Sequence, residues 1–169
     1  MLREVVERLP RGKDRGLLLV GGGMAALLAG GKVTGLVLFA RGVADIEAAW
    51  RQARPGFSGG FKARWGEAVT FYEATHRHPT NRALHRVGIP LILGGAVGLV
   101  VSPSYSPPWW AAAGSFATGW ALNLVGHAVF EKNRPAFADD PLSFVAGPVW
   151  DLRQWQARFG GAKAAPAPA

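Results

Sequence analysis

All four histidines of this 169-residue chain lie in two short segments. They are His76, His78, His85 and His127. The chain has no cysteine, so a metal site would have to use imidazole, carboxylate, amide or backbone ligands. Imidazole-rich sites without thiolates suit iron, zinc, copper or nickel. The pattern therefore predicts a metal site whose candidate ligands are the four histidines.

The first histidine segment also predicts where two helices meet. His78 precedes Pro79, and proline is tolerated in the first turn of a helix. One helix is therefore expected to end near His76 and another to begin after His78. In the second of these helices, Asn81 and His85 are i,i+4 neighbours and share one face.

In the second segment, Glu131 stands in the same i,i+4 relation to His127. Amide and carboxylate groups beside a metal-binding imidazole hold its ring N–H and fix its orientation. Asn81 and Glu131 are therefore the candidate catalytic residues, as partners of the histidines.

Two apolar stretches connect the histidine segments. Residues 87–101 and 109–126 are almost free of charge, and residues 102–108 between them form an uncharged turn with three prolines. Each stretch is near the lower length limit for crossing a bilayer, so the pair predicts a helical hairpin. Antiparallel pairing would bring His85 close to His127. Gly94 and Gly98 form a GxxxG pair that would permit close helix contact.

The chain is predicted to have three parts. Residues 1–60 form an N-terminal extension with one apolar membrane segment or hairpin, residues 61–159 form the histidine-containing membrane domain, and residues 160–169 form a disordered tail. The other expected elements are a short helix at 2–9, one crossing or a hairpin folding at Gly30-Gly31 within 17–40, a helix at 43–54, a loop at 55–60, a helix at 61–77, a helix cap at Asp139 and Asp140, and a short re-entrant or interfacial segment at 142–150.

The charge distribution bears on the cellular location. The formal net charge is +8, and Arg82, Arg86, Lys132 and Arg134 flank the hairpin, whose tip has no charge. By the positive-inside rule, the termini and the histidine cluster are cytoplasmic. We expect a bacterial inner membrane or an endoplasmic-reticulum-like membrane. A nucleic-acid partner is not expected, because charge and apolarity are segregated along the chain rather than on a basic face of a soluble core.

These observations predict an all-α integral membrane helical bundle, built from helical hairpins with short re-entrant or interfacial segments. The alternative is a soluble helical protein with a very apolar core, which the mean hydropathy of +0.12 would permit. The four histidines could likewise be interfacial polar side chains that reach water rather than metal ligands.

The two histidine segments resemble the DUF962, or Mpo1-like, family. The first family block reads here as Tyr72, His76, Asn81, His85, Gly88 and Pro90, and the second as Gly126, His127, Phe130, Glu131, Pro135 and Ala136. The resemblance covers about 65–155, including the closing Gly147-Pro148, and residues 1–60 have no counterpart in it.

The resemblance implies an activity and a ligand set. It implies an Fe²⁺-dependent dioxygenase that shortens long-chain 2-hydroxy fatty acids by one carbon, in fatty acid α-oxidation, with O₂ and the lipid bilayer as further partners. His76, His85 and His127 match the family pattern. The family places its extra histidine where Arg77 stands here, so His78 is a candidate from its position alone.

Three basic residues near the histidines are candidates for binding the substrate carboxylate. They are Arg82, Arg86 and Lys132, because guanidinium and ammonium groups pair with carboxylates. Two other functions stay open on the residues alone. One is a non-enzymatic membrane scaffold or lipid-binding protein with structural histidines, and the other is a zinc-dependent lipid hydrolase. A homo-oligomer is compatible with each of them.

Overall fold

The computed structural model describes residues 11–159, and within that range it is helical with no strand. Its elements are α2 (Lys13–Leu28), α3 (Lys32–Gln52), α4 (Phe61–Thr75), α5 (Pro79–Val101), α6 (Pro107–Val125), the π-helix η1 (Gly126–Glu131), the 3₁₀-helix η2 (Ala136–Ala138) and α7 (Ser143–Phe159). The all-α prediction is confirmed. The expected helix at 2–9 and the tail at 160–169 lie outside the described residues.

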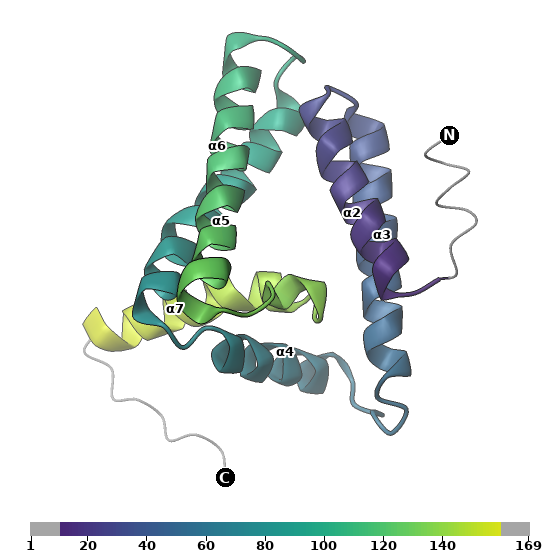
Figure 1. Ribbon diagram of the computed structural model, residues 1–169, viewed down its shortest axis with the longest axis vertical. Helices are drawn as coiled ribbons and strands as arrows, with labels where there is room; N and C mark the ends of the chain where they lie inside the picture. The colour runs from purple at the N-terminus through teal and green to yellow at the C-terminus, as the bar shows by residue number, and fades with distance from the viewer. Residues whose placement is uncertain (1–10, 160–169) are drawn as a thin grey trace.

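Two helical hairpins and a basal pair of helices form the molecule (Figure 1). One hairpin is α2 and α3, and the other is α5 and α6; they lean together at their tips and diverge toward the other end. There α4 and α7 pack against each other across the base. The histidine end of the α5–α6 hairpin therefore meets this basal layer.

The N-terminal hairpin folds at Gly30-Gly31, one of the two arrangements expected for residues 17–40. Gly30 adopts a positive φ of 78°, which glycine accommodates without the strain that a side chain adds. The second helix of the hairpin is longer than expected, because α3 continues through the helix predicted at 43–54. The N-terminal hairpin therefore extends from its turn at Gly30-Gly31 to the basal layer.

In the second hairpin, α5 and α6 approach each other through glycines. A Cβ at Gly88 would lie 2.9 Å from the Gly119 carbonyl oxygen, and one at Gly95 would lie 2.6 Å from the Phe116 nitrogen. The expected GxxxG contact is wrong at Gly94, where a Cβ would meet no atom of α6 within 4 Å, although a Cβ at Gly98 would meet Ala112. Gly88 and Gly95 share a face because seven residues make nearly two helical turns.

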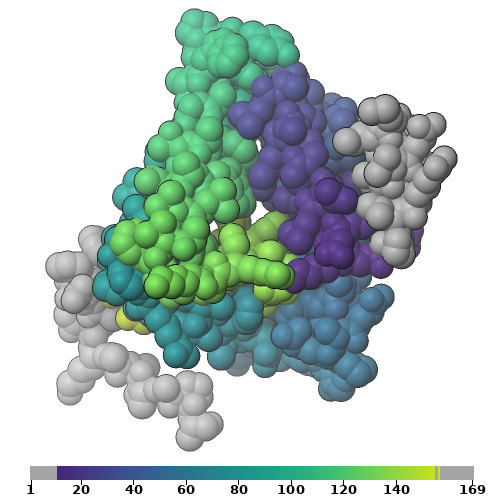
Figure 2. All heavy atoms as spheres, in the orientation of Figure 1, coloured from purple at the N-terminus to yellow at the C-terminus, as the bar shows by residue number. Residues whose placement is uncertain are grey.

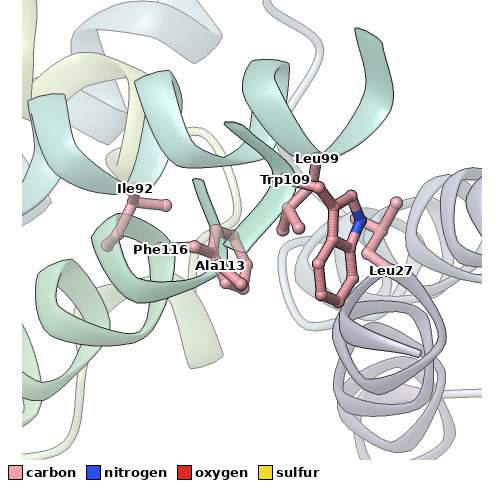
Figure 3. Close-up of a cluster of buried hydrophobic side chains, with 6 residues drawn as sticks. All are labelled: Leu27, Ile92, Leu99, Trp109, Ala113 and Phe116. Atoms are coloured by element: carbon pink, nitrogen blue, oxygen red, sulfur yellow. The ribbon is translucent and has the colours of Figure 1, made fainter. Parts of the chain in front are cut away.

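An apolar cluster joins the tips of the two hairpins (Figure 3). It contains Leu27 from α2 together with Ile92, Leu99, Trp109, Ala113 and Phe116 from the α5–α6 hairpin. The loops add polar links, since the Tyr105 hydroxyl donates to the Ala29 carbonyl at 2.7 Å and Lys32 donates to the Ser102 carbonyl at 2.6 Å. The tips are therefore held both by burial and by hydrogen bonds.

A buried arginine holds the basal layer together. The guanidinium of Arg64 on α4 donates to Asp140 at 2.6 and 2.9 Å and to Glu47 on α3 at 2.7 Å, and it lies 3.8 Å from the ring of Trp50. Burial by itself lowers the pKa of Arg64, but hydrogen bonds to Asp140 and Glu47 raise it above its ordinary value. Arg64 is therefore a permanent cation between three parts of the chain.

The start of α7 agrees with the sequence only in part. Asp140 accepts from the Leu142 N–H at 3.0 Å, so the expected helix-start role holds for this residue. Asp139 instead pairs with Lys13 of α2. The short segment expected at 142–150 is wrong: α7 is one continuous helix from Ser143 to Phe159. The length of α7 is supported by its packing against α4, a contact that the number of apolar residues in the segment does not predict.

Among residues 11–159, α5 is the one helix long and apolar enough to cross a bilayer. Its outer face carries exposed apolar side chains, including Val87, Val97 and Val101. The expected bundle of several crossing helices is thus reduced, in this structure, to a single candidate span.

The glycine contact yields a matched test. Gly95→Ala should destabilise the protein by about 1–3 kcal/mol, because its Cβ would press on the α6 backbone. Gly94→Ala, one residue away with open space at its Cβ, should have little effect or stabilise slightly, since alanine favours helix. Denaturation of both variants under one solvent condition measures the difference. Equal stability of the two would contradict the observed packing face.

Candidate metal centre

Three of the four histidines converge at the base of the α5–α6 hairpin. The ring centroids of His76, His85 and His127 lie 4.6, 4.7 and 4.9 Å apart, and the planes of each pair cross at 76° or more. Ring nitrogens, one from each residue, all lie within 4.8 Å of one another. The predicted proximity of His85 and His127 is confirmed, and His76 joins them.

Each histidine comes from a different local structure. His76 follows the last residue of α4, where its φ of −127° ends the helix, as the sequence predicted. His85 lies in the second turn of α5, and His127 lies in the π-helix η1. π-Turns inside helices are rare and frequently mark functional sites, because they redirect side chains from the α-helical register.

Hydrogen bonds fix the tautomer of all three rings. The Nδ1 atoms of His76 and His85 lie 2.9 and 3.0 Å from the carbonyl oxygens of Tyr72 and Asn81. Since a carbonyl only accepts, both Nδ1 atoms carry the proton. The Nδ1 of His127 lies 2.7 Å from Asn133 Oδ1.

The amide of Asn133 is itself oriented. Its Nδ2 donates to the Thr75 carbonyl at 2.9 Å, which leaves its oxygen to accept from His127. All three Nε2 atoms therefore keep a free lone pair, which is the form of imidazole that binds a metal.

The three rings are buried, each with 4 % or less of its surface exposed. Burial and the neighbouring His85 lower the pKa of His76 to about 3, so this ring is neutral at physiological pH. Three imidazole nitrogens gathered away from water fit a divalent transition metal. They also fit catalytic zinc, which takes three protein ligands and leaves one position open.

A small apolar cavity adjoins the triad. Its volume is about 30 Å³, enough for one or two small molecules of the size of water. Besides the histidines, its walls are Tyr72, Ile89, Trp120, Asn123, Leu124, Pro135, Ala136, Phe137, Ser143 and Phe144. A group bound at the three Nε2 atoms would therefore face a largely water-excluding space.

The remaining candidate residues lie around the triad rather than in it. His78 caps α5, where its Nδ1 accepts from the Thr80 N–H at 3.2 Å, and its ring packs against Phe130. Glu131 accepts from the His78 N–H at 2.6 Å and from the Asn81 amide at 3.3 Å. Asn81 and Glu131 thus hold the loop before α5, and Asn81 reaches His85 through its backbone carbonyl.

The three basic candidates lie outside the cavity lining. Arg82 donates to the His76 carbonyl at 2.5 Å and lies over the ring of Trp150. Arg86 pairs with Asp151 at 3.4 Å. Lys132 is exposed and adopts a left-handed backbone conformation at the end of the π-helix.

Asn133 is a site residue that sequence reasoning missed, and Tyr72, which the family block includes, was given no role there. Asn133 holds the His127 ring, although it is six residues away in the chain. Tyr72 stacks on His76 with ring centroids 3.8 Å apart, and burial raises the pKa of its hydroxyl. The signal for Asn133 in the sequence was its presence six residues after His127, in the segment HAVFEKN.

The comparison with known proteins agrees with this geometry. Residues 63–158 match the model of the Mpo1-like family, described as 2-hydroxy-palmitic acid dioxygenase Mpo1-like. The chain belongs to the Mpo1-like family. The family segment contains all three converging histidines, whereas α2 and α3 lie outside it. No curated protein and no solved structure matches the chain.

Metal content should distinguish the three converging histidines from His78. We expect His85→Ala and His127→Ala each to abolish stoichiometric metal binding, because each removes one of three nitrogen donors. His78→Asn should retain the metal, since asparagine also caps helix starts well. Elemental analysis of protein purified without an affinity tag measures the outcome. Loss of metal in His78→Asn equal to that in His85→Ala would place His78 among the ligands.

Substitution of Asn133 should lower the metal affinity more than substitution of Glu131. Asn133→Leu removes the acceptor of the His127 ring proton, and such changes lower metal affinity by about 10- to 100-fold. Glu131→Gln is the matched control, because its amide oxygen can still accept from the His78 N–H. Competition with a coloured chelator gives both affinities. A larger loss in Glu131→Gln than in Asn133→Leu would argue against the assigned partner of His127.

Proposed function

We propose that this Mpo1-like protein is an Fe²⁺-dependent dioxygenase that shortens long-chain 2-hydroxy fatty acids by one carbon. The observation that carries the proposal is the set of three buried imidazoles whose ring nitrogens lie within 4.8 Å of one another beside an apolar cavity. The family match to a 2-hydroxy-palmitic acid dioxygenase model supports the substrate class.

The charge of the site suits an anionic substrate. An imidazole ligand carries no negative charge, and the described residues place no carboxylate within the metal-binding group of His76, His85 and His127. A divalent ion held there would retain its positive charge, which favours a 2-hydroxy acid that offers both a hydroxyl and a carboxylate oxygen. Bound ferrous iron would supply a Lewis-acidic, redox-active centre for this acid and O₂.

The proposed reaction balances without a further reductant. One 2-hydroxy acid and one O₂ give the acid one carbon shorter, one CO₂ and one H₂O. The bond between C1 and C2 breaks, C1 is oxidised to CO₂, C2 is oxidised to the new carboxyl carbon, and O₂ is reduced. The residues of this chain hold the head of the acid and exclude water from it through the walls of the cavity.

The basic residues would act on the carboxylate from the rim of the site. Arg82 and Arg86 are held by the His76 carbonyl and by Asp151, so they provide a fixed positive field, and Lys132 is exposed beside the π-helix. We propose that these three cations draw the anionic head toward the triad. Such attraction acts on the association rate and weakens as salt increases.

The membrane is the proposed source of the substrate. Its support is the apolar outer face of α5 and the charge difference between the hairpin's uncharged tip and its basic end. We expect single cysteines at Ser104 and Lys132 to be labelled from opposite sides of a sealed membrane, with the Lys132 end cytoplasmic. Labelling of both from one side would refute a crossing hairpin.

A zinc-dependent lipid hydrolase is a second candidate. The observation in its favour is that three histidine nitrogens with a position left open are also a ligand set of catalytic zinc. This function would show bound zinc and a product that forms equally under air and under nitrogen.

The reaction itself is tested directly. Protein loaded anaerobically with Fe²⁺ should consume O₂ when given a long-chain 2-hydroxy fatty acid and release the acid one carbon shorter, in a ratio of one to one. His127→Ala serves as the inactive control. Mass spectrometry of products formed under air and under nitrogen checks the outcome. Unshortened substrate in the presence of bound Fe²⁺ would refute the dioxygenase.

A further inference from the structure

Four aromatic rings run from the metal cavity to the N-terminal hairpin. Trp120 and Phe144 stack with centroids 5.9 Å apart, Phe144 meets Phe137 edge to face at 5.9 Å, and Phe137 stacks on Phe39 at 6.4 Å. The first three rings line the cavity beside the histidines. The fourth ring, Phe39 of α3, stacks on Phe137.

The cavity is too small to hold a long acyl tail. Its volume of about 30 Å³ accommodates only a few atoms, so the tail of the proposed substrate must extend beyond the present walls. Burying that tail contributes about 0.8 kcal/mol per CH₂ group, so its path should be apolar. The aromatic row offers such a path, because Trp120 and Phe144 also pack against the apolar cluster between the hairpins.

Of the three aromatic walls, Phe137 is the one outside the long helices. It lies in the three-residue helix η2, whereas Trp120 and Phe144 belong to the long helices α6 and α7. Short 3₁₀ segments have poorer hydrogen-bond geometry than α-helices. Figure 2 shows the molecule hollowed between the two hairpins. Phe39 stacks on Phe137 and would therefore limit a displacement of that ring toward α3.

We infer that the acyl tail leaves the metal cavity beside Phe137, and that Phe39 of α3 sets the chain length accepted there. This inference rests on the proposed function. It also assigns a role to the N-terminal hairpin, because α3 lies outside the family segment at 63–158. Chain-length preference would then be a property of this hairpin, whereas the three histidines are part of the family segment.

The experiment compares wild type with Phe39→Ala, Phe39→Trp and Val37→Ala. Val37 is an exposed neighbour on the same helix and serves as the control. The activity of each Fe²⁺-loaded protein is measured as kcat/KM on a series of 2-hydroxy acids of increasing length. Anaerobic displacement of a fluorescent fatty acid by the same series gives binding separately.

Phe39→Ala should increase the preference for acids longer than the wild-type optimum by about tenfold, since a pocket discriminates methylene groups by about 10- to 200-fold. Phe39→Trp should shift the preference toward shorter acids, and Val37→Ala should leave it unchanged. If Phe39→Ala does not fold, the opposite shift in Phe39→Trp decides the question.

The two hypotheses fail in distinguishable ways. If wild type shortens the acids but both Phe39 variants keep its profile in activity and in binding, the tail site is refuted and the dioxygenase stands. If no protein yields a shortened product, yet the Phe39 variants shift the binding profile, the tail site stands and the dioxygenase is refuted.

Discussion

The close backbone contact between α5 and α6 is the constraint on which the site depends. The same pairing that seats Gly88 against Gly119 continues to the end of the hairpin, where a Cβ at Gly126 would lie 2.1 Å from Asn81 Oδ1. A side chain at Gly88 would press on the α6 backbone, so the two helices would have to move apart. The distance between His85 and His127 would grow with them, and two imidazoles could no longer reach one ion.

Arg64 supplies the second constraint, from the opposite side of the site. It anchors α4, which ends in His76, to Asp140, which precedes the α7 helix that bears Phe144. One guanidinium thus positions the third imidazole and a wall of the cavity together. A buried ion pair contributes little net stability, because desolvation offsets much of the attraction, but losing one partner leaves an unpaired buried charge. The role of the pair between Arg64 and Asp140 is therefore to fix one arrangement of α4 and α7.

Local patterns predicted the features that depend on neighbours in the chain. The helix start at His78-Pro79 and the uncharged hairpin turn follow from proline chemistry and charge, and pairing two helices brought His85 to His127. The contact between Arg64 and Asp140 spans 76 residues, and no local pattern encodes it. The expected pairing of Glu131 with the His127 ring was wrong: Glu131 accepts from the His78 N–H and the Asn81 amide, and the amide oxygen of Asn133 lies against the His127 Nδ1 instead.

The π-helix also constrains how this segment can change during evolution. A hydrogen bond joins the His127 ring to Asn133, and the left-handed Lys132 lies between them at the end of the π-helix. The number of residues between His127 and Asn133 therefore determines how the ring is oriented. Adding or deleting one residue between His127 and Asn133 would change the direction of the following chain and detach the amide from the imidazole. The segment can therefore vary by substitution but not in length. The exposed connection between α3 and α4 has no such requirement, so differences in length among relatives should accumulate there.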